Sequence, residues 1–192
     1  MDSDAALRAT RAWVERAVIG LNLCPFAKSV HVKGQVHYAV SAATDGRGLR
    51  DDLLRELRDL AAINPEVRDT TLLVAPDAFP DFLDFNDFLA TADRALAELD
   101  LEGILQIAPF HPRFVFAGTL DDDITNFTNR TPYPTLHLIR EASIDRAVQA
   151  FPEAEAIFEV NMVTMEKLGL EGWAALDVGP SLVAGDCGKL KP

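Results

Sequence analysis

The stretch that decides the fold reads Gly103-Ile-Leu-Gln-Ile-Ala-Pro-Phe-His-Pro-Arg-Phe-Val-Phe-Ala-Gly118. Its apolar runs, 104–108 and 114–117, predict two strands joined by a short bend. The first run is apolar on both faces, which predicts a central position in a sheet. Prolines stand close on both sides of His111 and cannot donate to a sheet ladder, so His111 is expected at a strand end.

Hydrophobic spacing on both sides of this stretch predicts an alternation of helices and strands. Further strands are expected at 36–41 and 70–75, and helices at 4–21, 47–62, 80–99, 143–150 and 153–168, the last ended by Gly169. Strands separated by single helices form right-handed crossovers and pair in parallel, whereas the strand after the bend should run antiparallel. The expected fold class is α/β: a single-domain mixed, mainly parallel sheet of about four strands with flanking helices. We expect one domain over 1–176 and a loosely ordered tail over 177–192.

Composition limits the classes of function. The chain has 192 residues, 48% hydrophobic and 25% charged, and a formal net charge of −12, as suits one globular domain. Such acidity argues against nucleic-acid and anionic-membrane partners, because phosphate binding requires a basic face. No run has the length of a membrane helix, and the first residues lack a signal pattern. We therefore expect a cytoplasmic protein in which Cys24 and Cys187 are free thiols.

Several segments together resemble a bacterial family known only as domain of unknown function 1415. The segments are Leu21-Asn-Leu-Cys-Pro-Phe-Ala27, Gly103-Ile-Leu-Gln-Ile-Ala108, Phe110-His-Pro112, Thr128-Asn-Arg-Thr-Pro-Tyr-Pro-Thr-Leu-His-Leu-Ile-Arg-Glu141, Asn161 and Leu168-Gly169. The resemblance extends over most of the chain, roughly 12–169. It implies one bacterial domain, and it assigns no activity, cofactor or catalytic residue.

The densest group of polar side chains able to do chemistry lies within 103–141. It consists of His111, Asn129, Arg130, Tyr133, His137, Arg140 and Glu141. Arginine binds carboxylate or phosphate through two parallel hydrogen bonds, and histidine moves protons near neutral pH. This pattern predicts a pocket for a small anionic molecule, with ligand-binding Arg130, Arg140, Tyr133 and Asn129 and catalytic His111 and His137. In the alternative, each arginine pairs with a nearby carboxylate and only fixes the loop.

A second candidate is Cys24, which begins a Cys-Pro-Phe-Ala segment similar to the redox loop of glutaredoxin-like proteins. The order of elements argues against that fold, because Cys24 follows a helix instead of a strand and no second cysteine stands at position 27. Cys24 remains a candidate nucleophile on another fold. The alternative is a small buried hydrophobic residue at a helix exit.

A metal site is a further alternative. His137 and Glu141 share one face if their segment is helical, and His111 could supply a third ligand for a metal that activates water. A strand would separate the first two, so no metal is favoured. The chain has no Walker loop, no GxGxxG and no GxSxG, so nucleotide cofactors have no positive support and the cofactor stays unknown.

The sequence thus leaves two classes of function open, and it leaves the oligomeric state open. One is a small-molecule enzyme or binder acting on an anionic metabolite, with a metal-dependent hydrolase using His111, His137 and Glu141 as its variant. The other is a non-catalytic interaction module that presents the 128–134 loop to a partner. A concave pocket with converging side chains favours the first, and a flat exposed loop favours the second.

Overall fold

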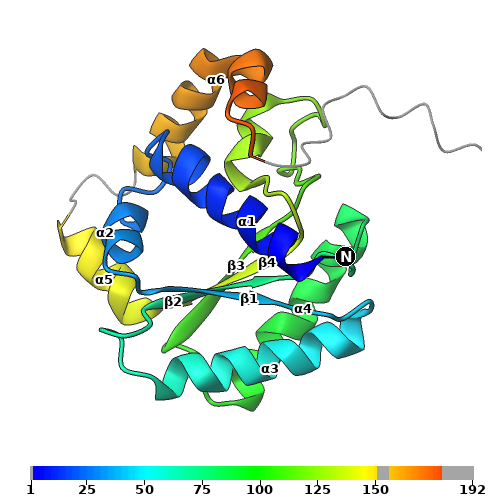
Figure 1. Ribbon diagram of the computed structural model, residues 1–192, viewed down its shortest axis with the longest axis vertical. Helices are drawn as coiled ribbons and strands as arrows, with labels where there is room; N and C mark the ends of the chain where they lie inside the picture. The colour runs from blue at the N-terminus through cyan, green and yellow to red at the C-terminus, as the bar shows by residue number, and fades with distance from the viewer. Residues whose placement is uncertain (1, 151–155, 179–192) are drawn as a thin grey trace, which may run out of the picture.

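A computed structural model describes residues 2–150 and 156–178 (Figure 1). Its elements in chain order are α1 (Ser3–Trp13), the π-helical η1 (Val14–Ile19), α2 (Ala27–Val32), β1 (Val36–Val40), α3 (Gly46–Ala62), β2 (Thr70–Val74), α4 (Phe82–Glu98), β3 (Leu105–Phe110), the 3-10 helix η2 (Ile124–Asn129), β4 (Thr135–Arg140), α5 (Glu141–Ala150) and α6 (Ile157–Ala175). The mixed α/β class with flanking helices is confirmed.

One four-stranded sheet, in the order β1-β2-β4-β3, forms the centre of the fold. β1 and β2 are parallel, and β4 is antiparallel to both of its neighbours. The expected mainly parallel pairing is therefore wrong, since two of the three strand pairs are antiparallel. The cause is the insertion of β4, the last strand in the chain, between β2 and β3. As a result β1, β2 and β3 all end at the same edge of the sheet, where β4 begins.

Two expectations about individual strands are also wrong. The run 114–117 lies in a loop without regular structure, and the fourth strand is Thr135–Arg140, which pairs antiparallel with β3. The run 104–108 belongs to an edge strand, because β4 shields only one side of β3. Ile104 is 51% exposed and Gln106 is exposed. Apolar residues here reflect packing of one face on α4, which periodicity cannot distinguish from a central position.

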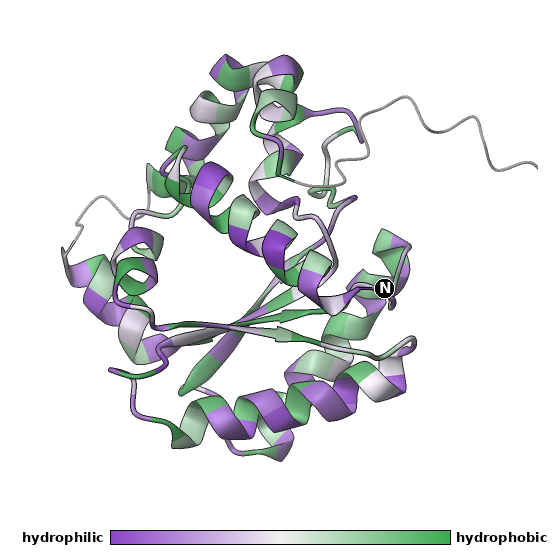
Figure 2. Cartoon of the chain, in the orientation of Figure 1, coloured by the Kyte–Doolittle hydropathy of each residue, from purple (hydrophilic) through white to green (hydrophobic). Residues whose placement is uncertain are grey.

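Helices cover both faces of the sheet. Figure 1 shows α3 and α4 on one side of the strands and α1 and α6 on the other. The first side holds a core cluster that includes Leu53, Phe85 and Leu138, and the second holds one that includes Trp13, Leu72 and Met165. Figure 2 shows hydrophilic and hydrophobic residues mixed along α1 and α3, as expected for helices that bury one stripe and expose the other.

Local signals explain most helix boundaries. The carboxylates of Asp45 and Asp81 accept backbone N–H groups at the starts of α3 and α4. Gly169 does not end the last helix as expected. It kinks α6, with φ 63° and ψ 177°, and the helix continues to Ala175. Within the described residues, no helix is long and apolar enough to span a membrane. Cys187 and most of the predicted tail lie outside those residues, and the single-domain division stays a prediction.

Candidate functional site

A hollow of about 430 Å³ opens at the edge where β2 and β3 end and β4 begins. It is lined by Pro76, Asp77, Ala78, Pro80, His111, Pro112, Arg113, Pro132, Tyr133 and Pro134. Ligands of α/β proteins commonly bind outside the carboxyl ends of strands, where loops converge. The size falls within the range of small-molecule pockets, so this hollow is the candidate site.

Prolines dominate its walls: Pro76, Pro80, Pro112, Pro132 and Pro134 make up half of the lining residues. Each proline fixes its own φ and restricts the residue before it. The walls therefore lose little conformational entropy when a ligand binds, because their backbone is constrained beforehand.

His111, buried to 1% exposure, holds two of these walls together. Its Nδ1 accepts the backbone N–H of Arg113 at 3.0 Å, so the proton sits on Nε2, which donates to the Phe79 carbonyl at 3.0 Å. Burial lowers the pKa of His111, and the hydrogen bond to Phe79 opposes that shift. With both ring nitrogens engaged, the neutral imidazole fixes the pocket wall. Its expected place at a strand end is confirmed, since β3 ends at Phe110.

Charge in the hollow comes from Arg113 and Asp77, both exposed and both missed in the sequence analysis. Arg113 forms no ion pair within residues 2–150 and 156–178. It lies close enough to His111 and Arg130 to lower the pKa of each, after the larger effect of burial. The signal for Arg113 was its position beside His111 after a proline. Tyr133, which the sequence did indicate, lines the hollow and is half-buried.

Arg130 lies behind this wall, not in it. Its Nε donates to the Phe114 carbonyl at 3.1 Å, a terminal nitrogen donates to the Asp121 carbonyl at 2.6 Å, and its guanidinium stacks 4.3 Å from the Phe127 ring centroid. Burial lowers its pKa, Asp121 opposes the shift and Arg113 adds to it. Arg130 also lines a cavity of about 10 Å³ that shares Pro112 and Pro132 with the hollow. Arg130 thus fixes the loop, as the alternative interpretation held, but it does so by donating to backbone carbonyls instead of pairing with a carboxylate.

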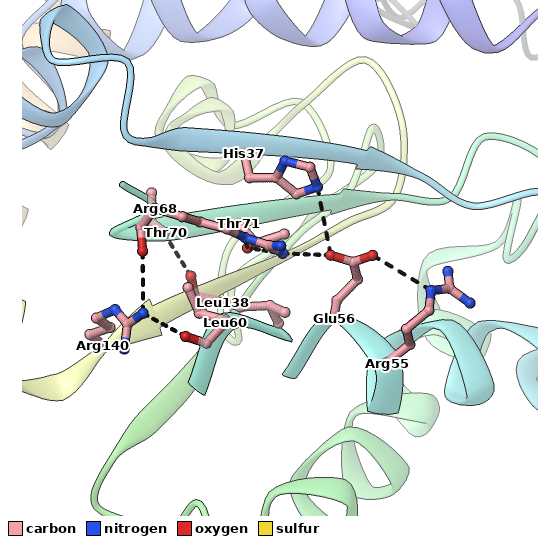
Figure 3. Close-up of polar contacts among 9 residues, drawn as sticks. All are labelled: His37, Arg55, Glu56, Leu60, Arg68, Thr70, Thr71, Leu138 and Arg140. Atoms are coloured by element: carbon pink, nitrogen blue, oxygen red, sulfur yellow. Dashed lines mark hydrogen bonds and ion pairs between the residues drawn. The ribbon is translucent and has the colours of Figure 1, made fainter. Parts of the chain in front are cut away.

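Arg140 lies at the opposite end of β4. Its terminal nitrogen donates to the carbonyls of Leu60, Ile63 and Arg68, which closes the end of α3 onto the sheet. Figure 3 shows the contacts with Leu60 and Arg68. Burial lowers the pKa of Arg140, and Asp69 opposes the shift. The structure therefore does not bring Arg130 and Arg140 together around one ligand.

His137 is separated from His111 by the sheet. It points to the α1 face with Leu72, whereas His111 packs on Phe82 and Phe85 of α4, at ring-centroid distances of 5.5 and 5.2 Å. The Thr70 hydroxyl, 2.7 Å from His137 Nε2, donates to a strand carbonyl and therefore accepts the His137 proton. Burial lowers the pKa of His137 to about 4.

The alternative metal set is not assembled. His111 and His137 lie on opposite faces, and Glu141 follows β4 as the first residue of α5. Among the residues that the structure describes, no group of three or more His, Cys, Asp or Glu side chains is placed to hold a metal ion.

The remaining candidates are Asn129 and Cys24. The Asn129 side-chain amide donates to the Pro109 carbonyl at 3.3 Å, and the Asn129 backbone carbonyl accepts the His111 backbone N–H at 3.2 Å, so Asn129 joins the loop to the end of β3. The half-buried Cys24 lies in the turn before α2 and does not line the hollow. Next to it, the Leu23 carbonyl accepts the Asn161 amide at 2.9 Å, which ties the turn to α6.

The 128–134 loop is not an exposed surface. Arg130, Thr131, Pro132 and Pro134 are buried, and the loop is bonded to β3 and to η2. A flat, exposed epitope was the condition for the interaction-module interpretation, and this loop does not meet it.

A buried ion pair lies between α3 and the start of β2 (Figure 3). It was not predicted from the sequence. Glu56 of α3 lies 2.5 Å from the guanidinium of Arg68, which also donates from Nε to the Thr71 hydroxyl at 2.9 Å. His37 of β1 approaches Glu56 at 3.8 Å. Burial lowers the pKa of His37, with Arg68 acting in the same direction and Glu56 against it. This cluster joins α3 to β1 and β2.

Fold and hollow together define a mixed α/β protein with a proline-walled pocket at the carboxyl edge of its parallel strands. The family model described as "Protein of unknown function (DUF1415)" matches residues 5–175, and the chain belongs to this family. No curated protein and no solved structure matches the chain.

Proposed function

We propose that this protein binds a small anionic metabolite, with a carboxylate or phosphate group, in the hollow at the ends of β2 and β3. The observation that carries the proposal is Arg113. It is an exposed guanidinium on the wall of a hollow of about 430 Å³, and within the described parts of the chain it has no carboxylate partner. In a chain of net charge −12, an arginine left available for a ligand is a local exception.

The surroundings of Arg113 support the same conclusion. The His111 imidazole holds the Arg113 backbone N–H, so the base of the side chain is fixed while its guanidinium stays accessible. Arg130 lies near enough to be affected by its charge, which adds to the positive potential on this side. Two neighbouring cations favour an anion between or beside them.

Binding, not proton transfer, is the activity that these groups favour. His111 is neutral and uses both nitrogens, so it is not placed to accept a proton from a ligand without breaking a wall contact. A small-molecule binder is therefore preferred over a His111-dependent enzyme. Tyr133 offers an aromatic surface for the ligand's uncharged part.

The test is a titration of the ¹⁵N-labelled full chain, followed by amide chemical shifts. The probes are inorganic phosphate, glutarate, 4-methylpentanoate and 3-phenylpropanoate, each at constant ionic strength. At least one should shift the amides around Arg113 with saturation. Arg113→Gln should weaken its affinity about 10- to 100-fold, the loss of a charge-assisted hydrogen-bond pair.

Arg58→Gln is the matched control, because Arg58 is an exposed arginine on α3 that lines no part of the hollow. It removes the same charge and should leave the affinity unchanged. Equal weakening by both substitutions would show that the effect comes from net charge alone and not from Arg113 itself. Absence of any saturable shift of amides near the hollow would refute the proposal.

A further inference from the structure

A second, much smaller cavity lies behind the wall of the hollow. It has a volume of about 10 Å³, and Pro112 and Pro132 line both spaces. Its lining residues are Trp13, Pro112, Phe127, Arg130, Thr131, Pro132, Trp173 and Val178. All of them except Pro112 are buried. A cavity of this size holds a single water-sized occupant, so the ligand of the hollow does not fit into it.

Trp13, at the end of α1, brings an unpaired donor to the lining of this cavity. The residue is 2% exposed, and its buried indole Nε1 has no hydrogen-bond partner among the described residues. Unpaired buried donors are rare in native proteins, because each one loses its hydrogen bond to water without a replacement. An acceptor bound in the cavity that Trp13 lines supplies the replacement.

Arg130 lines the same cavity and has hydrogens to spare. Its bonds to the Phe114 and Asp121 carbonyls use two of the five N–H groups of a guanidinium. One face of the group lies on the Phe127 ring, 4.3 Å from its centroid. Both polar side-chain groups considered so far, the indole and the guanidinium, can only donate. An occupant that accepts hydrogen bonds therefore suits the cavity.

The charge of Arg130 favours an anion as that acceptor. Arg130 is 9% exposed and forms no ion pair within 2–150 and 156–178, since its two hydrogen bonds go to neutral carbonyls. None of the described residues that line the cavity carries a carboxylate. A buried charge without a counter-charge is costly, and an anion beside the guanidinium removes that cost. Burial accordingly lowers the pKa of Arg130, and Arg113 adds to this shift.

We propose that this cavity binds a monatomic anion, a halide such as chloride. The Trp13 N–H and the Arg130 guanidinium donate to the ion, and the aromatic rings and prolines of the lining separate it from bulk water. The ion joins the end of α1 to the loop before β4, directly behind the two prolines that the cavity shares with the hollow. This site is separate from the hollow and does not depend on the proposed function.

Tryptophan fluorescence tests the proposal, because both tryptophans of the chain line the cavity. The full chain is titrated with sodium iodide, which quenches indole fluorescence on contact. Sodium gluconate, whose anion is too large for the cavity, keeps the ionic strength constant, so that screening of the net charge of −12 does not change during the titration. Quenching should saturate, and sodium chloride should reverse it by competition.

Two variants assign the quenching to the Trp13 N–H. Trp13→Phe keeps an aromatic ring and removes the N–H, while Trp173 stays as the reporter. Iodide affinity should fall about ten-fold or more, as expected for a lost hydrogen bond to a charged group. Trp173→Phe is the matched control. It removes the other tryptophan from the same cavity and keeps the Trp13 N–H, so the affinity should change much less.

Arg113→Gln separates this cavity from the hollow, because Arg113 lines only the hollow. It should leave the saturable quenching unchanged. Chloride should also raise the unfolding temperature of the wild type above its value in gluconate at equal ionic strength, since a ligand that binds the folded chain stabilises it. That measurement needs no variant to fold.

Three results overturn the halide site. One is quenching that rises linearly with iodide, together with equal unfolding temperatures in chloride and gluconate. Another is equal weakening of iodide binding by Trp13→Phe and Trp173→Phe. The third is loss of the saturable quenching in Arg113→Gln, which places the ion in the hollow. None of these results contradicts the anionic metabolite proposed for the hollow, whose own test uses the amide shifts around Arg113.

Discussion

Replacement of Arg140 by alanine should cost about 2–5 kcal/mol of unfolding free energy. One terminal nitrogen of its guanidinium serves three carbonyls, those of Leu60, Ile63 and Arg68, at the place where α3 ends beside the sheet. That nitrogen has two hydrogens, so at most two full hydrogen bonds are lost. Each bond from a charged donor contributes about 1.5–3 kcal/mol.

A partial offset lowers the total. Arg140 Nε is buried without a hydrogen-bond partner, and its removal relieves that cost, which is on the order of 1 kcal/mol. The carbonyls at the end of α3 then remain without a donor in a buried position, because the alanine methyl group cannot reach them. Arg140→Lys keeps the charge and one reachable donor, so it should lose about half as much.

Urea unfolding of the full chain, followed by far-ultraviolet circular dichroism, measures this directly. Arg58→Ala on the same helix is the control. It removes an exposed arginine that has no ion pair in the described ranges, and it should change stability by less than about 0.5 kcal/mol. A loss below 1 kcal/mol for Arg140→Ala would show that the end of α3 is stabilised by something other than this guanidinium.

Three further predictions follow from buried or strained groups. Burial lowers the pKa of His137 from 6.5 to about 4, so the unfolded chain binds a proton on this residue more readily than the folded chain does. The contribution of His137 to stability is therefore full above pH 6.5 and falls by up to about 3 kcal/mol towards pH 4. In urea unfolding measured as a function of pH, His137→Gln should show a shallower fall in stability. Arg68→Met should lose about 3–5 kcal/mol in urea because Glu56 is left buried and unpaired, and the double variant Arg68→Met/Glu56→Leu should be more stable than the single one. Gly169→Ala should lower the unfolding free energy by about 1–3 kcal/mol, since φ 63° and ψ 177° are strained for alanine; equal thermal stability would contradict this.

The local elements could be predicted because their signals are local. β1 and β2 lie within the predicted runs, and α3 begins at Gly46 beside the predicted start at 47. The fourth strand could not, because Thr135–Arg140 has the length and composition of either a strand or a helical turn. Its insertion between β2 and β3 is a long-range pairing, which no local pattern specifies.

Only some of the residues of the candidate site could be predicted from the sequence. His111 and Tyr133 line the hollow, but the arginine that lines it is Arg113, not Arg130 or Arg140. Guanidinium groups bind carbonyls as readily as ligands. Arg130 is taken up by the Asp121 carbonyl in the loop before it, and Arg140 by carbonyls at the distant end of α3, such as that of Ile63. Only the folded loops show which arginine remains available.

The direction of β4 explains why the hollow exists at all. Since β4 is antiparallel to β2 and β3, its beginning lies at the edge where they end, and the Pro132–Pro134 turn meets the loops after both strands. A parallel β4 would place that turn at the opposite edge and would bring Arg140 to the edge where β2 and β3 end. The order and sense of the strands decide which loops share an edge of the sheet, and for that reason Arg113 and Asp77 line the same hollow.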